Sequence, residues 1–364
     1  MKRLLLPALS FLSAFASPAQ DVCGFLDYRD RFFVFDSGTF KELEPLRPRG
    51  FASGGGYLIY AASNGDLKVY RDGKVTTIDQ SIATMPAITD NYIGYITAGV
   101  LKIYDHGTLQ VLCNNTTASV VEDSVAAFYD EVQRTLSIHY RGKTIQAEDA
   151  LVENPVQKWS AGDNTIAWIN KMTHELYVFY RGEVLVLASL ITDIPITAGL
   201  DMVAYQDPSD HGLKVFFRGD VIDLEPVMPE KIDMGKGLFA YIDRSGALKV
   251  FQNGKAYTAL SFTPEEYYVK DSLVVIKDKG QCKIYHDGIT EPVMPYWPSL
   301  WAARWGTFAY LDADLTLGVW RNGVSSTVMQ REPVKGMSLD RGLLSITLTN
   351  NAMKFWWKGQ LYAP

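Results

Sequence analysis

The stretch that decides the fold is Leu213-Lys214-Val215-Phe216-Phe217-Arg218-Gly219. It describes a short apolar strand that runs into a glycine turn, and its pattern recurs ten times along the 364 residues. Neighbouring copies lie 34 to 40 residues apart. The ten glycines are Gly38, Gly73, Gly107, Gly142, Gly182, Gly219, Gly254, Gly288, Gly323 and Gly359. A fixed period of this size indicates a repeat architecture in which each unit packs on its neighbours.

Each repeat unit contains several short β-strands. In one unit, residues 238–243, 248–251 and 256–260 are rich in β-branched and aromatic side chains and are separated by turn residues. The dipeptide Asn253-Gly254 accepts a positive φ at both positions, as a two-residue type I′ hairpin requires. A fourth, innermost strand is expected after the proline-containing connection, as at residues 87–89, 119–121 and 267–269.

The first strand of each unit is almost continuously apolar, as in residues 273–276, so both of its faces are expected to be covered. Four antiparallel strands per unit, repeated around an axis, predict an all-β β-propeller with ten short four-stranded blades in one ring. Two five-bladed rings are the alternative, and an open β-solenoid is a third arrangement. The ring closes either with a three-stranded first blade or with a sheet that the first and tenth blades share.

The first strand often ends in the form Ala-Tyr-x-Asp. Copies stand at Ala204-Tyr205-Gln206-Asp207, Ala240-Tyr241-Ile242-Asp243 and Ala309-Tyr310-Leu311-Asp312. With this strand end and the glycine turn that follows it, residues 20–364 resemble the broad superfamily of WD40- and TolB-like propellers. The resemblance implies the architecture and says little about function. The Trp-Asp and Gly-His dipeptides of WD40 repeats do not occur, so the chain is not assigned to that family.

The N-terminus has the composition of a secretory signal peptide. Lys2-Arg3 precedes an apolar run over residues 4–16, which is too short to span a membrane. We expect residues 1–19 to be removed after Ser17-Pro18-Ala19, with cleavage after Ala14-Phe15-Ala16 as the alternative. Residues 20–364 then form a single propeller domain that is exported to the periplasm or the extracellular space and carries no transmembrane segment.

Charge and cysteine content restrict the function further. The formal net charge is −6, and loss of Lys2 and Arg3 makes it about −8, which argues against nucleic-acid binding. The three cysteines, Cys23, Cys113 and Cys282, do not form a disulfide scaffold, although one bridge among them is left open.

Three recurring types of polar residue are interpreted as structural. The histidines match no catalytic or zinc motif and are interpreted as solvated turn residues: His106, His139, His174, His211 and His286. The aspartates that end the first strand are interpreted as turn formers rather than calcium ligands: Asp130, Asp207, Asp243 and Asp312. The lysines of the repeat are expected to lay their stems on apolar neighbours: Lys68, Lys102, Lys214, Lys249, Lys283 and Lys354. We therefore expect no catalytic residue, metal or cofactor.

A binding site should lie where the repeat is interrupted. Between Gly288 and Gly323, the connecting segment carries three tryptophans four residues apart together with a tyrosine and an arginine, and two tyrosines hold the corresponding place one unit earlier. Trp, Tyr and Arg are enriched at interface hot spots. The predicted partner- or ligand-binding residues, near the mouth of the channel, are Tyr267, Tyr268, Tyr296, Trp297, Trp301, Arg304 and Trp305. Packing between blades 8 and 9 is the alternative role for these aromatics.

These patterns favour an exported, non-enzymatic β-propeller that binds a protein partner as an assembly module of the cell envelope or secretion machinery. One alternative is a carbohydrate-binding propeller that uses Trp297, Trp301 and Trp305 as stacking platforms. A second alternative is a polysaccharide-active enzyme, which requires paired carboxylates in one pocket.

Overall fold

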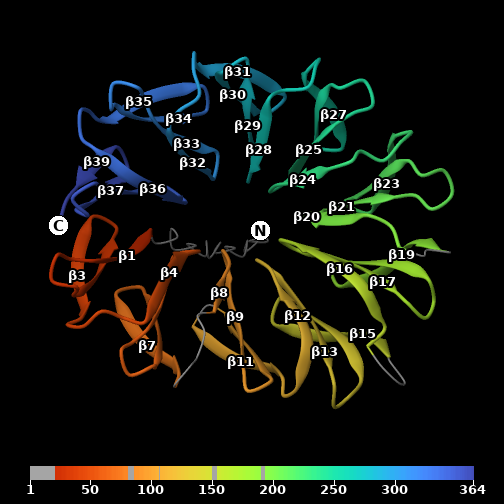
Figure 1. Ribbon diagram of the computed structural model, residues 1–364. Helices are drawn as coiled ribbons and strands as arrows, with labels where there is room; N and C mark the ends of the chain where they lie inside the picture. The colour runs from red at the N-terminus through yellow and green to blue at the C-terminus, as the bar shows by residue number, and fades with distance from the viewer. Residues whose placement is uncertain (1–20, 81–85, 106, 150–153, 190–192) are drawn as a thin grey trace, which may run out of the picture.

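The computed structural model describes residues 21–364 except 81–85, 106, 150–153 and 190–192. The described residues form ten antiparallel sheets that surround a central channel as the blades of one ring (Figure 1). The predicted single ten-bladed ring is therefore confirmed, and the two-ring and solenoid alternatives are wrong. Within the described ranges, no helix is long and apolar enough to cross a membrane.

Strands occupy the same four places in successive blades. The innermost strands are β4 (Gly50–Gly54), β8 (Ala87–Ile88), β12 (Thr116–Val121), β16 (Val156–Gly162), β20 (Ile196–Gly199), β24 (Ile232–Met234), β28 (Glu266–Lys270), β32 (Leu300–Arg304) and β36 (Val334–Asp340). The second strands are β1 (Val22–Leu26), β5 (Tyr57–Ala61), β9 (Tyr92–Thr97), β13 (Val125–Asp130), β17 (Thr165–Asn170), β21 (Met202–Gln206), β25 (Leu238–Ile242), β29 (Leu273–Asp278), β33 (Thr307–Leu311) and β37 (Leu343–Leu348).

The third strands carry the repeated seven-residue pattern. They are β2 (Phe32–Asp36), β6 (Leu67–Arg71), β10 (Val100–Asp105), β14 (Thr135–Tyr140), β18 (Glu175–Tyr180), β22 (Leu213–Phe217), β26 (Leu248–Gln252), β30 (Gln281–His286), β34 (Leu317–Arg321) and β38 (Met353–Trp357). The outer strands are β3 (Thr39–Glu44), β7 (Lys74–Asp79), β11 (Thr108–Cys113), β15 (Lys143–Asp149), β19 (Glu183–Ser189), β23 (Asp220–Glu225), β27 (Lys255–Leu260), β31 (Ile289–Met294), β35 (Val324–Met329) and β39 (Gln360–Tyr362).

The turn between the third and outer strands has the predicted type I′ character. Asn253 and Gly254 have φ values of 52° and 79°. Arginine also adopts this conformation: Arg218 has a φ of 54° before Gly219, and its guanidinium lies 4.9 Å from the centre of the Phe217 ring. A cation stacked on the preceding aromatic ring offsets part of the strain of a positive φ in a residue with a Cβ.

Apolar side chains fill the seams between neighbouring blades. The seam between blades 5 and 6, for example, packs Ile169 and Val178 against Val203 and Phe216, all fully buried. The ring closes through the same kind of seam, in which Phe25 and Phe35 of blade 1 pack against Phe355 of blade 10. Cores of this kind explain why the second strands are apolar on both faces.

Blade 1 differs from the other nine. Its sheet contains β1, β2 and β3 in the described residues, whereas each other sheet contains four strands. Blade 10 takes all four of its strands from the C-terminal segment, so the closure in which blades 1 and 10 share a sheet is wrong among the residues described. The indole of Trp357 fastens the two blades by donating a 2.8 Å hydrogen bond to Asp21 Oδ2.

Four of the six repeated lysines join neighbouring blades through ion pairs, whereas Lys214 and Lys283 pair with aspartates of their own blades. In blade 7, Lys249 Nζ lies 2.8 Å from Glu225 Oε1, which ends the outer strand of blade 6. The same carboxylate oxygen accepts a 2.8 Å hydrogen bond from the hydroxyl of Tyr241, which is fully buried. Lys68 with Glu44, Lys102 with Asp79 and Lys354 with Glu332 repeat the lysine contact. The lysines are therefore structural, as expected. They stabilise the ring through ion pairs with carboxylates, in addition to the expected packing of their aliphatic stems.

Truncating Glu225 to alanine is expected to lower the free energy of unfolding by about 2 kcal/mol, because the buried Tyr241 hydroxyl loses its acceptor. Urea unfolding followed by fluorescence measures the change. Glu230→Ala is the matched control, because Glu230 is exposed on the same connection and its loss should cost less than about 0.5 kcal/mol. Equal losses for the two variants would contradict this role for Glu225.

Candidate functional site

Three of the seven predicted site residues come together. The ring centres of Tyr268 on β28 and Trp301 on β32 lie 5.3 Å apart, and Trp297 lies 6.2 Å from Tyr268 and 5.8 Å from Trp301. Trp301 also contacts the buried ring of Phe308 at 5.9 Å. Trp297 and Trp301 thus pack in the seam between blades 8 and 9, half-exposed, which is the alternative role that the sequence suggested.

The other four predicted residues lie apart from this trio. Tyr267 packs in the seam between blades 7 and 8, and Lys231 Nζ lies 5.6 Å from its ring centre. Tyr296 is exposed. Arg304 and Trp305 lie at the turn after β32 and belong to a cluster of charged side chains. The seven residues therefore do not form one site.

The charged cluster consists of Asp90, Asp123, Asp163, Lys236, Arg304, Trp305 and Asp340. These residues lie at the ends of six innermost strands or in the turns that follow them, and these strands converge on the channel (Figure 1). Lys236 Nζ lies 2.8 Å from Asp90, 3.0 Å from Asp123 and 3.7 Å from Asp163. Blade 7 is therefore linked directly to blades 3, 4 and 5.

Arg304 and Trp305 connect the cluster to the last blades. The guanidinium of Arg304 lies 3.3 Å from Asp90 and 3.2 Å from Asp340. The indole of Trp305 lies under the Lys236 ammonium, with 4.3 Å between Nζ and the ring centre. A cation–π contact and several carboxylates thus hold one ammonium. The cluster links blades on different sides of the channel and should keep the ring rigid at this end.

Burial raises the pKa values of three carboxylates of the cluster, Asp90, Asp163 and Asp340. Burial and a hydrogen bond to Asp123 raise the pKa of Asp163 to about 7. Burial and the charge of Asp123 likewise raise the pKa of the adjacent Glu122 to about 7. Burial opposes the charge of Lys236, but hydrogen bonds to Asp90 and Asp123 outweigh it and raise the lysine pKa. In the part of the chain described, no group of three His, Cys, Asp or Glu residues is arranged to hold a metal ion.

The stability of the propeller is expected to fall as the pH rises from about 4 to 8. The native pKa of Asp163, about 7, lies above its ordinary value of 3.8, so the native state holds a proton that the unfolded state releases. This stabilisation is complete below the unfolded pKa and is lost as the pH rises through the folded one. Asp163→Asn should therefore flatten the pH dependence by about 1–3 kcal/mol in urea unfolding between pH 5 and 8. Asp287→Asn, at an exposed hairpin, should leave the slope unchanged.

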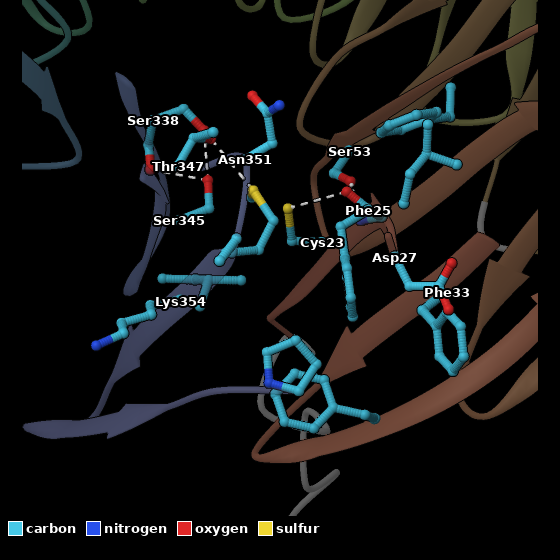
Figure 2. A pocket seen from close by; sticks show the side chains of 18 of the residues that line it. Cys23, Phe25, Asp27, Phe33, Ser53, Ser338, Ser345, Thr347, Asn351 and Lys354 are labelled. Carbon is cyan, nitrogen blue, oxygen red and sulfur yellow. Dashed lines mark hydrogen bonds between the residues drawn. The ribbon is translucent and has the colours of Figure 1, made fainter. Parts of the chain in front are cut away.

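A second feature is a groove along β1, which we call the blade 1 groove. It has a volume of about 1560 Å³ and follows β1 from the turn at Tyr28 to Arg304 and Asp340 of the charged cluster. Figure 2 shows Ser338, Ser345, Thr347 and Asn351 of blade 10 on one side of it and Ser53 on the other, with Cys23 between. Tyr28 and Phe51 are exposed at its border.

The recurring polar residues mostly follow expectation. The turn aspartates accept backbone hydrogen bonds, as in Asp243 with Ser245 N at 2.8 Å and Asp130 with Val132 N at 2.8 Å. The prediction of solvated turn histidines is wrong for two of them. His139 is buried in β14, and burial lowers its pKa. His286 is the last residue of β30, and its ring packs 5.0 Å from that of Trp320. His106 lies outside the described residues. All three cysteines, which are among the described residues, are free.

Sequence reasoning missed the charged cluster and the groove. The cluster had a weak signal, because acidic residues such as Asp90, Asp123 and Asp163 follow successive innermost strands. That signal could not show that a lysine from blade 7 meets them. The sequence contained an indirect signal for the groove. The chain before Cys23 is short, which suggested a three-stranded first blade.

Comparison with known proteins agrees with the architecture. A family model described as the 10-bladed beta propeller domain matches residues 16–362. The chain belongs to this family of ten-bladed propellers. A comparison of this ten-bladed propeller with curated proteins finds no significant match.

Solved structures similar to this ten-bladed propeller match it at low identity. The computationally designed Ika8 protein has 14% identity and a TM-score of 0.36, over 84% of this chain and 95% of that chain. The CRINKLY WD40 ectodomain of the Arabidopsis thaliana receptor kinase ACR4 has 10% identity and a TM-score of 0.34, over 77% and 97%. Prp20p from Saccharomyces cerevisiae has 10% identity and a TM-score of 0.30, over 66% and 71%. At these TM-scores the similarities carry no argument about function.

Proposed function

We propose that this propeller is an exported, non-enzymatic module that binds a protein partner within an assembly of the cell envelope or secretion machinery. The observation that carries the proposal is the blade 1 groove. Its volume of about 1560 Å³ exceeds the roughly 300–1,000 Å³ of small-molecule sites and suits a polypeptide segment. Two large apolar side chains that line it are exposed, with Tyr28 at 84% and Phe51 at 39%. Exposed apolar groups that gather at a concave surface favour an interaction site.

The aromatic trio supports a protein partner better than a sugar. A stacking platform for carbohydrate needs a free ring face. The rings of Tyr268 and Trp297 stack on each other, and Trp301 contacts Tyr268, Trp297 and Phe308. The trio therefore offers ring edges and the exposed side of Tyr268, which suit the mixed contacts of a protein surface.

The carboxylates of the groove weigh against a polysaccharide-active enzyme. Asp27 pairs with Arg31 at 2.7 Å, and Asp340 pairs with Arg304 at 3.2 Å. A glycosidase needs one carboxyl group that keeps its proton and a second that attacks or activates water. Hydrogen bonds from Arg31 outweigh the desolvation of Asp27 and lower its pKa, so Asp27 does not suit the general acid. Burial raises the pKa of Asp340 although Arg304 lies beside it, but Asp340 lies at the end of the groove away from Asp27, so the two do not form such a pair.

Affinity capture from the native cell envelope tests the proposal. The tagged protein should retain one stoichiometric partner, and Tyr28→Asp should lose it, because Tyr28 is exposed at the end of the groove. Val132→Asp is the matched control, since Val132 is exposed at the corresponding turn of blade 4. Fractionation of the same cells tests export. Absence of a stoichiometric partner, together with glycan-array binding that Trp301→Ala abolishes, would favour the carbohydrate alternative.

A further inference from the structure

We propose that the edge of β1 that is unpaired among the described residues binds an extended segment of a partner protein, which becomes the fourth, innermost strand of blade 1. The inference rests on the proposed protein-binding function and specifies how the partner is held. Addition of a strand to an exposed sheet edge is a common form of peptide recognition, with affinity from main-chain hydrogen bonds and selectivity from alternate side chains.

One set of backbone amides of β1 points away from β2. Gly24 N–H belongs to this set and donates a 3.1 Å hydrogen bond to Ser53 Oγ of blade 2, so an added strand must replace Ser53 as its acceptor. The backbone oxygen of Asp21 and the amide of Asp27 instead bond Ser37 and Arg31, on the side of β2. Because alternate residues of a strand direct their amides to the same side, Val22 and Leu26 face the groove together with Gly24. In the described residues, β1 pairs with β2 alone.

The register shows which strand the edge can accept. Gly24 pairs with Val34 as Ala204 of blade 6 pairs with Val215, so the two residues hold equivalent places. Ala204 also pairs with Thr197 of the innermost strand β20. Ala198, the next residue of β20, directs its amide away from β21 and donates to Ser160 Oγ at 2.9 Å. A strand that takes the place in blade 1 that β20 takes in blade 6 therefore directs alternate amides to β1. Its other amides point toward blade 10, as the Ala198 amide points toward blade 5.

The walls of the groove define the chemistry of the segment. Hydroxyl and amide groups of Ser53, Ser345 and Asn351 face it, together with the rings of Phe25 and Phe33. Innermost strands elsewhere in the ring approach each other closely, so that a Cβ on Gly162 would lie 2.3 Å from Gly199 Cα. The partner segment should therefore be uncharged, with Gly, Ala, Ser or Thr at its centre. The positively charged Arg304 and the acidic Asp340 lie at one end of the groove.

The segment of this chain that precedes β1 is an alternative occupant. Residues 15–19 equal the five-residue length of the innermost strand β4, and two residues separate them from β1 in the sequence. We expect cleavage after Ala19, which removes these residues from the exported protein. The edge then becomes accessible on export, and the occupant comes from a partner.

A fused strand tests the proposal. A copy of residues 195–200, placed directly before Asp21 in the mature protein, should form the hairpin with β1 that β20 forms with β21. In the matched control, the copy carries proline at the Thr197 position, which removes the amide that faces β1. A second control carries proline at the Ala198 position, whose amide faces away. Proline is tolerated in an edge strand only where its missing amide faces outward.

Cys23 reports whether the groove is filled. It is half-buried and lies in the groove, whereas Cys113 and Cys282 are buried, so alkylation measures Cys23. A strand joined directly to β1 acts at millimolar effective concentration or above, so we expect about tenfold slower alkylation with the copy and with the Ala198 control. The Thr197 control should react like the mature protein. Equal rates for both proline variants would overturn strand addition.

Partner capture separates this inference from the proposed function. The copy and the Ala198 control should lose the partner captured from the envelope, and the Thr197 control should retain it. If the filled groove still captures the partner, strand addition is wrong while protein binding stands. If the mature protein captures no partner, the proposed function itself fails. Protein isolated from the native cell with residues 15–19 retained and Cys23 protected would show that the chain fills its own groove, which also overturns the proposal.

Discussion

Replacing Lys236 with methionine is expected to lower the free energy of unfolding by about 3 kcal/mol at pH 8. The substitution leaves Asp90, Asp123 and Asp163 facing one another without the ammonium that lies 2.8 to 3.7 Å from them. Removal of one partner from a buried ionic group costs about 3–5 kcal/mol, and we take the lower end because the lysine side chain is 24% exposed. Urea unfolding measures the loss.

Lys249→Met is the matched control for this prediction. Lys249 is 25% exposed and also contacts two carboxylates, Glu225 and Asp243, but it joins two neighbouring blades at their outer side. Its loss should cost about 1 kcal/mol, as for partly exposed ion pairs. The loss for Lys236→Met should shrink at pH 5, where Asp163 and Glu122 are protonated. Equal losses for the two variants, unchanged by pH, would contradict a special role for the cluster.

The fold could be predicted because it depends on local patterns that repeat. Type I′ turns such as Asn253-Gly254 are determined by two neighbouring residues. The second strands can be recognised by their almost entirely apolar composition. Ten weak copies of one pattern reinforce one another, since a wrong assignment in one unit would break the period. The same repetition identified the structural lysines and turn aspartates.

The candidate site could not be predicted in the same way, because its parts are distant in sequence and occur once. Lys236 meets Asp90 across 146 residues, and Arg304 meets Asp90 across 214. Within their own repeat units, Lys236, Arg304 and Asp90 look like ordinary charged surface residues. The interruption at Trp297, Trp301 and Trp305 was a real departure from the repeat, yet the structure divides it between a seam and the charged cluster. The groove depends on how the ring closes, which no single unit encodes.

Replacing Phe355 with alanine is expected to weaken the closing seam by about 4 kcal/mol, the usual cost of deleting a fully buried aromatic side chain. Phe355 is fully buried, and its ring stacks on Phe35 with 4.8 Å between centres and an angle of 6°. This seam differs from the other nine because the chain does not cross it. Among the described residues, side-chain contacts hold blade 10 on blade 1, so the deletion should open the ring at its ends before the remaining blades unfold.

The control for the closing seam is Phe251→Ala in blade 7. Phe251 is fully buried and stacks on Phe239 at 5.0 Å, so its loss should cost a similar free energy. In blade 7, however, the chain enters and leaves through neighbouring blades, which limits local opening. Limited proteolysis in native buffer should therefore cut near both termini in Phe355→Ala and leave Phe251→Ala intact, and Cys23 should be alkylated faster in Phe355→Ala alone. Equal proteolysis of the two variants would show that the closing seam is no weaker than an interior one, and the blade 1 groove would then be as rigid as the rest of the ring.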